Sequence, residues 1–441
     1  MTDWDAATDE CVEHLRALIR IQSVNPPGGE TAAAEYCASV LRAAGIAAEV
    51  LEAAPGRGSC FARLPATADD PLPPLILLSH LDVVTVDRDA WTHDPFAAEL
   101  IDGVVWGRGA VDMKDMVAME LAVMLAMARS GASRSRDVIF AALADEEAGG
   151  LFGALHWVRQ RPELFGSTAG VAAAAINEVG GYSITLDGRR FYTIQVAEKG
   201  ILWTRLRARG TPGHGSMPHD DNPAIKLAAA VVRLAGAKQP VRVNDVVRGF
   251  FEALGLGDAL GGDSAAVLER RVEDPVLRRS LDAMLRDTVS PNMIHVGQKM
   301  NVIPGAGEAE IDVRTLPGTD QDAFLRQLAT IAGDDVQVEA VMAMPPVEWP
   351  ADAPIVTLMR SALQTADPEA TAVPMMITPG TDAKALALLG IPTYGFAPLR
   401  LEPDVPFLSL FHGNDERVPV SALAFGLPVL HEVVDRFVRA T

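Results

Sequence analysis

Short runs of consecutive apolar residues recur along the chain, and several of them stop at histidine or acidic residues. The clearest run covers residues 75–78 and leads into Ser-His-Leu-Asp at 79–82. An uninterrupted apolar run of this length is typical of a strand buried on both faces. Runs at 138–144 and 170–176 end in the same way, at Asp-Glu-Glu and at Asn-Glu, and a further strand is predicted over 391–398.

Longer segments with helical spacing lie between these strands. Two helices are predicted within about residues 5–44, joined by the loop S-V-N-P-P-G-G-E, whose prolines and glycines interrupt the helical pattern. A long helix rich in Met, Ala and Leu follows Asp112, and an amphipathic helix is expected from about Val420. Buried strands that alternate with helices predict an α/β fold.

The pattern changes in the middle of the chain. An alternating strand begins at about Lys199, a helix is expected to start at Pro223, and a turn at Asn301 leads into an alternating strand that reaches Arg314. These features predict a second, smaller unit.

Composition narrows the class of protein. With 441 residues and 49% hydrophobic content, the chain is long enough for two domains with sizeable cores. A net charge of −20 argues against nucleic acid or an anionic membrane as a partner. The three cysteines lack C-x-x-C spacing, so neither a disulfide framework nor a thiolate zinc site is indicated. No signal peptide or long apolar span is recognisable, and a cytoplasmic protein is expected.

Histidine and carboxylates at strand ends suggest chemistry. His80 and Asp82 are two apart at the end of a predicted strand, so they point the same way at the edge where α/β sheets usually bind ligands. An isolated H-x-D is more often a surface or core histidine. The pattern gains weight from Asp112, which follows G-R-G-A-V at a helix start, and from the acids at 145–147, whose mutual repulsion is costly unless cations offset it.

The candidate ligands are residues at the ends of separate elements: His80, Asp112, Glu147, Glu178 and His412. Imidazole and carboxylate without thiolate suit zinc, with manganese or cobalt as replacements. One ion cannot use all five side chains. Two ions that share Asp112 as a bridge would each have three protein ligands.

The ordered motifs H-L-D, G-R-G-A-V-D-M-K and D-E-E, with the later Glu178 and His412, resemble the signature of the zinc exopeptidase/aminoacylase family. That family includes acetylornithine deacetylase, succinyl-diaminopimelate desuccinylase, aminoacylase, carboxypeptidase S and the glutamate carboxypeptidases. The resemblance covers nearly the whole chain. It implies a catalytic domain, 1–198 and 347–441, with a mixed, mostly parallel sheet between helices, and an inserted α+β lid and dimerisation domain, 199–346.

The same resemblance implies two Zn²⁺ per chain. One ion would be held by His80, Asp112 and Glu178, and the other by Asp112, Glu147 and His412. Asp82 would orient His80, and Glu146 would be the general base that takes a proton from the water between the metals and passes it to the leaving nitrogen. The family also implies a cis peptide after Asp112.

Further roles follow from the resemblance in the middle and late segments. His214, in G-H-G, would be a lid histidine that stabilises the developing oxyanion, often in the partner subunit's site, so a homodimer through the lid is expected. Asn301, Arg314, Gly380 and Thr381 would contact the substrate. His93 is expected to be structural or solvent-exposed and His219 to be structural. The segment 241–291 matches no shared motif, and a lid extension is its interpretation.

The predicted reaction is hydrolysis of an amide or peptide bond next to a free carboxylate, with an N-acyl amino acid or short peptide as the small-molecule substrate. An aminopeptidase, which needs a free substrate amine, and a ureido or carbamoyl amidohydrolase, which releases ammonia and carbon dioxide, remain alternatives. A non-catalytic metal-binding relative is a third, although a binding protein has no use for the base Glu146.

Overall fold

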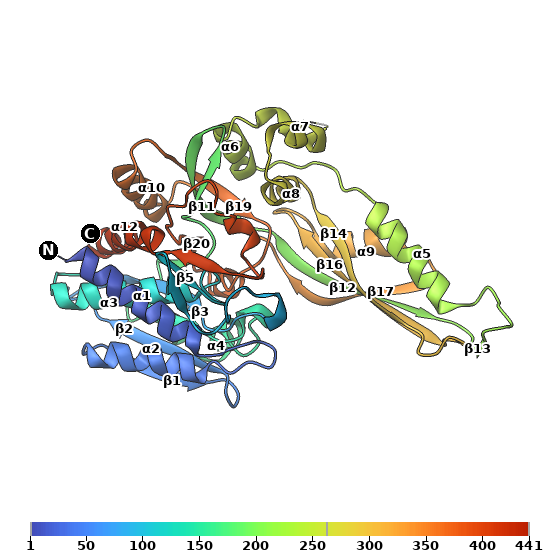
Figure 1. Ribbon diagram of the computed structural model, residues 1–441, viewed down its shortest axis with the longest axis horizontal. Helices are drawn as coiled ribbons and strands as arrows, with labels where there is room; N and C mark the ends of the chain where they lie inside the picture. Colours follow the sequence, from blue (N-terminus) through green and yellow to red (C-terminus); the bar gives the residue numbers. More distant parts are fainter. Residues whose placement is uncertain (1, 262, 440–441) are drawn as a thin grey trace. The chain divides into compact units, whose positions relative to one another are not determined.

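The computed structural model describes residues 2–261 and 263–439, which form two compact units (Figure 1). The first unit contains residues 2–196, 349–375 and 381–439. The second contains the described residues of 197–348 together with 376–380. This last short segment lies outside the predicted inserted domain; it joins the second unit because Ile377 accepts a hydrogen bond from the N–H of Lys199 at 3.1 Å.

A mixed sheet forms the centre of the first unit. Its strand order is β1-β2-β6-β3-β9-β20-β11-β10; β19 also pairs with β11, as does the short β18, whose two residues are counted with the second unit. The strands are β1 Ala47–Glu52, β2 Gly58–Leu64, β3 Leu72–His80, β6 Arg136–Leu143, β9 Ala174–Asn177, β10 Ser183–Leu186, β11 Arg189–Glu198, β18 Val347–Glu348, β19 Thr371–Ile377 and β20 Thr393–Gly395. The inner pairs β6-β3, β3-β9 and β9-β20 are parallel, whereas the outer pairs are antiparallel, which confirms the predicted sheet.

The register of the parallel strands determines which residues meet at the sheet edge. Residues 75–78 of β3 are fully buried between two neighbouring strands, as their apolar sequence requires. His80 is opposite Leu143 of β6, and Leu77 is opposite Ile176 of β9. The segments that follow β3, β6 and β9 therefore leave the sheet at one edge.

Helices pack against this sheet and against one another. They are α1 Trp4–Arg20, α2 Thr31–Ala43, α3 Lys114–Ser130, α4 Ala154–Gln160, α10 Pro354–Ala366, α11 Ala383–Leu386 and α12 Val420–Arg439. Helix α3 is buried through most of its length against α1, α12 and β3, because its Met, Ala and Leu residues present little polar surface. Among the helices of the described residues, none is both long and apolar enough to cross a membrane.

The strand predicted over 170–176 is shorter in the structure. Residues β8 Gly170–Val171 pair instead with β7 Gly166–Ser167, and β9 begins at Ala174. The break lies at residues 172–173, between β8 and β9.

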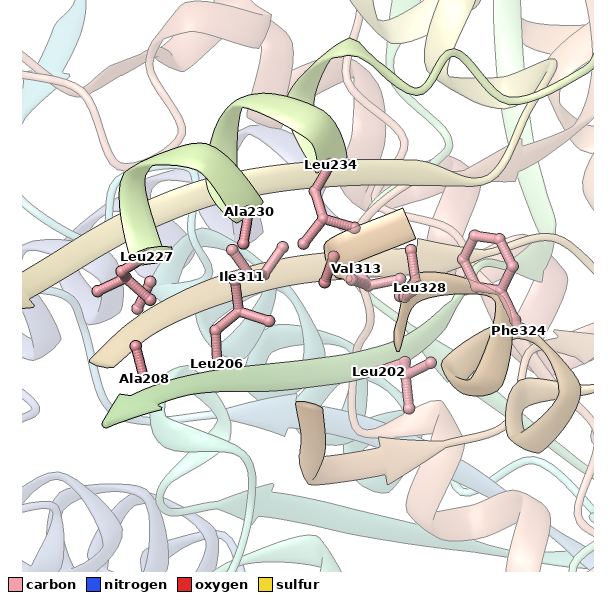
Figure 2. Close-up of a cluster of buried hydrophobic side chains, with 12 residues drawn as sticks. Leu202, Leu206, Ala208, Leu227, Ala230, Leu234, Ile311, Val313, Phe324 and Leu328 are labelled. Carbon is pink, nitrogen blue, oxygen red and sulfur yellow. The ribbon is translucent and has the colours of Figure 1, made fainter. Parts of the chain in front are cut away.

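The second unit contains an antiparallel sheet of order β14-β16-β12-β17, with α5 Pro223–Gly236 and α9 Gln321–Ala332 packed on it. The strands are β12 Gly200–Arg209, β14 Thr288–Val296, β16 Ala306–Thr315 and β17 Val336–Met344. Figure 2 shows the core of this unit, where Leu227 and Leu234 of α5 and Phe324 of α9 pack with Leu206 and Ile311 from the strands. This α+β arrangement agrees with the expected inserted unit.

The segment without a shared motif is helical, with α6 Asp245–Ala253, α7 Ser264–Arg271 and α8 Pro275–Met284. Lys199, which directly precedes β12, forms hydrogen bonds to the end of this helical segment and to β14. The buried Nζ of Lys199 donates to the carbonyl oxygens of Ala283 and Arg286 at 3.1 and 2.8 Å and to the hydroxyl of Thr288 at 3.0 Å.

Candidate metal centre

The five predicted ligands lie together in the first unit, in two groups that share one residue. The groups are His80, Asp112 and Glu178, and Asp112, Glu147 and His412. Within each group the potential ligand atoms lie within 4.8 Å of one another. The shared edge of β3, β6 and β9 accounts for three of these residues, while Asp112 precedes α3 and His412 belongs to a loop near the C-terminus.

Asp112 divides its two carboxylate oxygens between the groups. Its Oδ1 lies 3.2 Å from Nε2 of His80, and its Oδ2 lies 3.2 Å from Nε2 of His412. His80 Nε2 is also 3.6 Å from Glu178 Oε2, and His412 Nε2 is 3.1 Å from Glu147 Oε2. Ligands bound tetrahedrally at zinc distances are about 3.3–3.5 Å apart, so these spacings fit two ions bridged by Asp112.

The electrostatics of the cluster also fit cations. Burial raises the pKa of Glu146 well above its usual value, and the charges of Glu178 and Glu147 raise it further. Burial and then the charge of Asp112 raise the pKa of Glu147 to about 7. Hydrogen bonds to Asp112 and Glu147 raise the pKa of His412 to about 10. Oε1 of Glu147 is buried and has no hydrogen-bond partner within residues 2–261 and 263–439. Divalent ions would offset the repulsion among these carboxylates.

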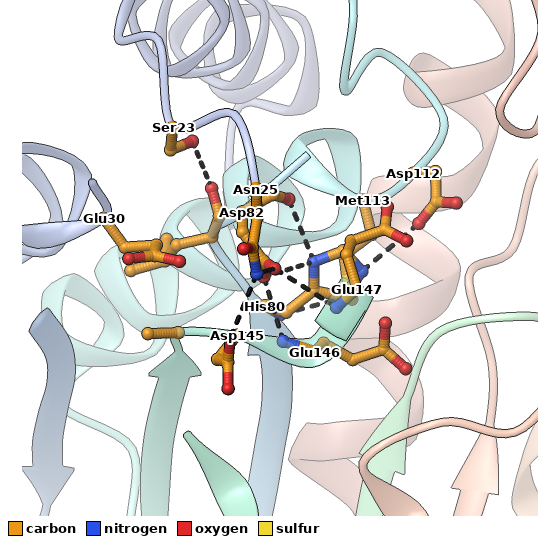
Figure 3. A network of polar contacts seen from close by, with 12 residues as sticks. Ser23, Asn25, Glu30, His80, Asp82, Asp112, Met113, Asp145, Glu146 and Glu147 are labelled. Carbon is orange, nitrogen blue, oxygen red and sulfur yellow. Dashed lines mark hydrogen bonds and ion pairs between the residues drawn. The ribbon is translucent and has the colours of Figure 1, made fainter. Parts of the chain in front are cut away.

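Asp82 contacts Nδ1 of His80, the ring nitrogen that does not face Asp112 (Figure 3). Nδ1 of His80 lies 3.1 Å from the carbonyl oxygen of Asp82 and 3.4 Å from its Oδ1, so Nε2 faces the acidic cluster. The same carboxylate accepts the N–H groups of Glu146 and Glu147, each at 3.1 Å. One buried carboxylate thus orients the imidazole and fixes the backbone of both acids, as an outer-shell partner in a metal site does.

Asn25 was not among the residues singled out from the sequence. Its Nδ2 donates to Asp82 Oδ2 at 2.8 Å and to Asp145 Oδ1 at 3.0 Å (Figure 3). Asp145 and Glu30 in turn pair with the guanidinium of Arg57 at 2.6 and 2.7 Å. The only signal for this network was an asparagine before two prolines, in a loop interpreted as a connection between helices.

The segment that carries Asp112 is anchored to the first helix. The peptide between Asp112 and Met113 is cis, as the family resemblance implied. The next residue, Lys114, is buried, and its Nζ donates to the carbonyl oxygens of Leu18 and Ile21 at 3.0 and 2.8 Å. These bonds join the start of α3 to carbonyl groups at the end of α1.

His214 and Asn301 lie beside each other in the second unit. His214 belongs to β13 Gly213–His214, which pairs with β15 Val302–Ile303, and the N–H of Gly215 donates to the carbonyl oxygen of Asn301 at 2.9 Å. Nδ1 of the exposed His214 accepts the N–H of Ser216 at 3.2 Å, so in the neutral ring Nε2 carries the proton.

Two of the remaining predicted substrate residues, Arg314 and Thr381, have partners inside the chain. Nε and Nη2 of Arg314 donate to the two oxygens of Asp312 at 2.6 and 3.1 Å, which uses two of the five guanidinium donors. The buried hydroxyl of Thr381 accepts from Asn177 at 2.9 Å and from the N–H of Ala383 at 3.2 Å. Thr381 lies in the first unit and Gly380 in the second.

His93 and His219 have no role in the predicted site. His93 pairs with Glu99 at 2.9 Å and packs against the ring of Trp106. His219 is half-buried near Gly213. Neither residue belongs to a cluster that could hold a metal among the described residues.

The fold and the paired ligand groups define a metal-dependent hydrolase. The model of Peptidase family M20/M25/M40 matches residues 76–436, and the chain belongs to this family. Human aminoacylase-1 is 27% identical over 420 residues, which cover 94% of this chain and 92% of that protein.

Solved structures share the same fold. An M20 family metallo-carboxypeptidase from Sulfolobus solfataricus matches with a TM-score of 0.75 at 18% identity, covering 97% of this chain and 98% of the other. A Bacillus subtilis protein described as a dinuclear metal binding peptidase of the M20 family matches with a TM-score of 0.61 at 15% identity, covering 99% and 100%. At these identities the likeness establishes the fold alone.

Proposed function

We propose that this hydrolase cleaves an amide or peptide bond next to a free carboxylate, in N-acyl amino acids or short peptides, with two divalent ions bound. The observation that carries this proposal is the division of the Asp112 oxygens between His80 and His412. Zinc suits the ligand set, and manganese or cobalt can replace it. The similarity to human aminoacylase-1 supports a substrate of this kind.

Glu146 is proposed as the general base. Two bound ions would polarise the substrate carbonyl and acidify the attacking water. Glu146 lies outside both ligand groups, and within the described residues no hydrogen bond occupies its carboxylate. A carboxylate in this position can accept a proton from water and then return it to the leaving nitrogen.

The second unit is proposed to supply the remaining substrate contacts. The protonated Nε2 of His214 is a donor suited to the developing oxyanion. Arg314 is proposed to bind the substrate carboxylate through guanidinium donors that Asp312 leaves free.

Arg314→Ala is expected to reduce kcat/KM about ten- to a hundredfold for substrates with a free carboxylate, since such a charge-assisted contact contributes about 1.5–3 kcal/mol. Steady-state kinetics on matched acid and carboxamide substrates measure this effect. Arg205→Ala is the control, because Arg205 also lies on this sheet in an ion pair, with Glu310 at 2.7 Å. Equal hydrolysis of acids and carboxamides by the unmutated enzyme would disprove the assignment.

A homodimer through the second unit is also proposed. Strand β14 lies at the end of its sheet and exposes Met293 and Ile294, and the neighbouring helix α5 exposes Ile225 and Val232. An unprotected edge strand beside apolar side chains favours pairing with a second copy about a twofold axis.

A substrate panel tests the proposed reaction against its alternatives. N-acetyl amino acids, dipeptides, amino acid amides and N-carbamoyl amino acids would be incubated with the protein and added zinc, manganese or cobalt. Release of a free amino acid from N-acyl or peptide substrates supports the proposal. Activity that requires a free substrate amine indicates an aminopeptidase, release of ammonia and carbon dioxide indicates a carbamoyl amidohydrolase, and no turnover indicates a non-catalytic relative.

A further inference from the structure

Glu416 connects the two loops that carry Asp112 and His412. Its Oε1 accepts the N–H groups of Val111 and Asp112 at 2.7 and 3.0 Å. Its Oε2 accepts the N–H of Gly109 at 3.0 Å and Nη1 of Arg108 at 2.8 Å. The side chain is fully buried. Burial raises the pKa of Glu416 to about 7, and the charge of Arg108 and the backbone N–H donors act in the opposite direction.

Backbone pairing continues this connection. The N–H of Gly107 donates to the carbonyl oxygen of Glu416 at 2.9 Å, and beyond it β21 Arg417–Pro419 pairs with β5 Val104–Trp106. Because Trp106 is opposite Arg417 in this antiparallel pair, the segment that leads to Asp112 and the segment that comes from His412 leave it at the same end. Glu416 is therefore the residue at which the two ligand-bearing loops meet.

The loop around His412 depends on such contacts. His412 and Asp415 both have a φ of 57°, in the left-handed region that costs energy for residues other than glycine. Asp112, by contrast, is followed almost directly by α3, whose first residue Lys114 is anchored to α1. Loss of the Glu416 contacts would release His412 more than Asp112.

We propose that Glu416 is a positioning residue that sets the spacing between Asp112 and His412, and with it the affinity for the ion held by Asp112, Glu147 and His412. This inference rests on the two-ion site proposed above. Glu416 itself touches neither ligand group's metal-binding atoms; it acts through the backbone of Asp112 and through the loop that leads to His412.

Calorimetric titration of the metal-depleted protein with zinc tests this inference. Glu416→Gln keeps the size of the side chain but turns an amide NH₂ toward N–H donors. Glu416→Gln is expected to lower the affinity for one ion roughly 10- to 100-fold, which is the usual effect of losing an outer-shell partner. The affinity for the other ion should be unchanged. His412→Ala shows which site is affected, because His412 is a ligand of only one of the two ions. The ion that Glu416→Gln still binds tightly should have the same affinity as the ion that His412→Ala retains.

Asp415→Asn is the matched control. Asp415 is an acid on the same loop, and it accepts the N–H and hydroxyl of Thr92, both at 2.7 Å, away from the Asp112 segment. It should bind both ions as the unmutated protein does. Glu416→Asp keeps the charge opposite the buried Arg108, so it preserves folding if the glutamine variant fails, and its shorter reach should weaken the same ion.

Two results would overturn the inference. One is unchanged binding of both ions by folded Glu416 variants, and the other is an equal loss of both ions, which indicates a general structural defect. If the unmutated protein itself binds fewer than two ions, the result refutes the proposed two-ion site on which this inference rests. Two ions in the unmutated protein with no selective loss in the variants refute the role of Glu416 alone.

Discussion

Glu146→Ala is expected to lower kcat by about two orders of magnitude or more while both metal ions remain bound. The substitution removes the proposed proton acceptor but none of the five ligands. The backbone N–H of residue 146 still donates to Asp82, which should keep the loop in place. Steady-state kinetics combined with elemental analysis of the purified variant measure both quantities.

Glu147→Ala is the matched comparison, because it changes the adjacent residue of the same short helix. Glu147 belongs to the group of Asp112 and His412, so its loss should release an ion as well as activity. If Glu146→Ala loses an ion and Glu147→Ala loses only rate, the roles of the two acids have been exchanged.

Mixed dimers of Glu146→Ala and His214→Ala are expected to regain activity that neither variant has alone. If His214 completes the site of the partner subunit, one site of each heterodimer combines an intact Glu146 with an intact His214. Because one of the two sites is intact, the heterodimer should recover up to about half of the activity of an unmutated dimer. His214→Ala alone should be nearly inactive, since loss of an oxyanion donor typically costs 100-fold or more in rate. Co-expression with two different affinity tags isolates the heterodimer for assay.

Two controls make this experiment decisive. Co-expression of two differently tagged Glu146→Ala chains should give inactive dimers, which excludes contamination by unmutated enzyme. If isolated heterodimers of Glu146→Ala and His214→Ala are inactive, His214 acts within its own chain or has no catalytic role.

The sequence predicted the central sheet and the clustering of the ligands because both depend on local patterns. The apolar run at 75–78 is typical of a buried strand, and the polar residues after such a strand are expected at the sheet edge. The same reasoning applied to the runs before Glu147 and Glu178. His412 follows the strand predicted over 391–398 only after a loop, so its place at the same sheet edge was a less direct prediction.

Outer-shell contacts could not be predicted because they join distant segments. Asn25 and Asp82 are 57 residues apart, and Asp112 and Glu416 are 304 residues apart. Neither the period of the hydrophobic pattern nor residue type specifies such hydrogen bonds. The ion pair of Arg314 with Asp312 is different, since residues two apart on a strand share a face and the pairing could have been anticipated.

The number of ions bound per chain tests the central claim most directly. The metal-depleted protein would be titrated with zinc, followed by elemental analysis and by assay on the best substrate of the panel. Two ions per chain are predicted, because five ligands with a shared Asp112 form two sites. A firm plateau at one ion per chain, with full activity, would contradict the bridged site.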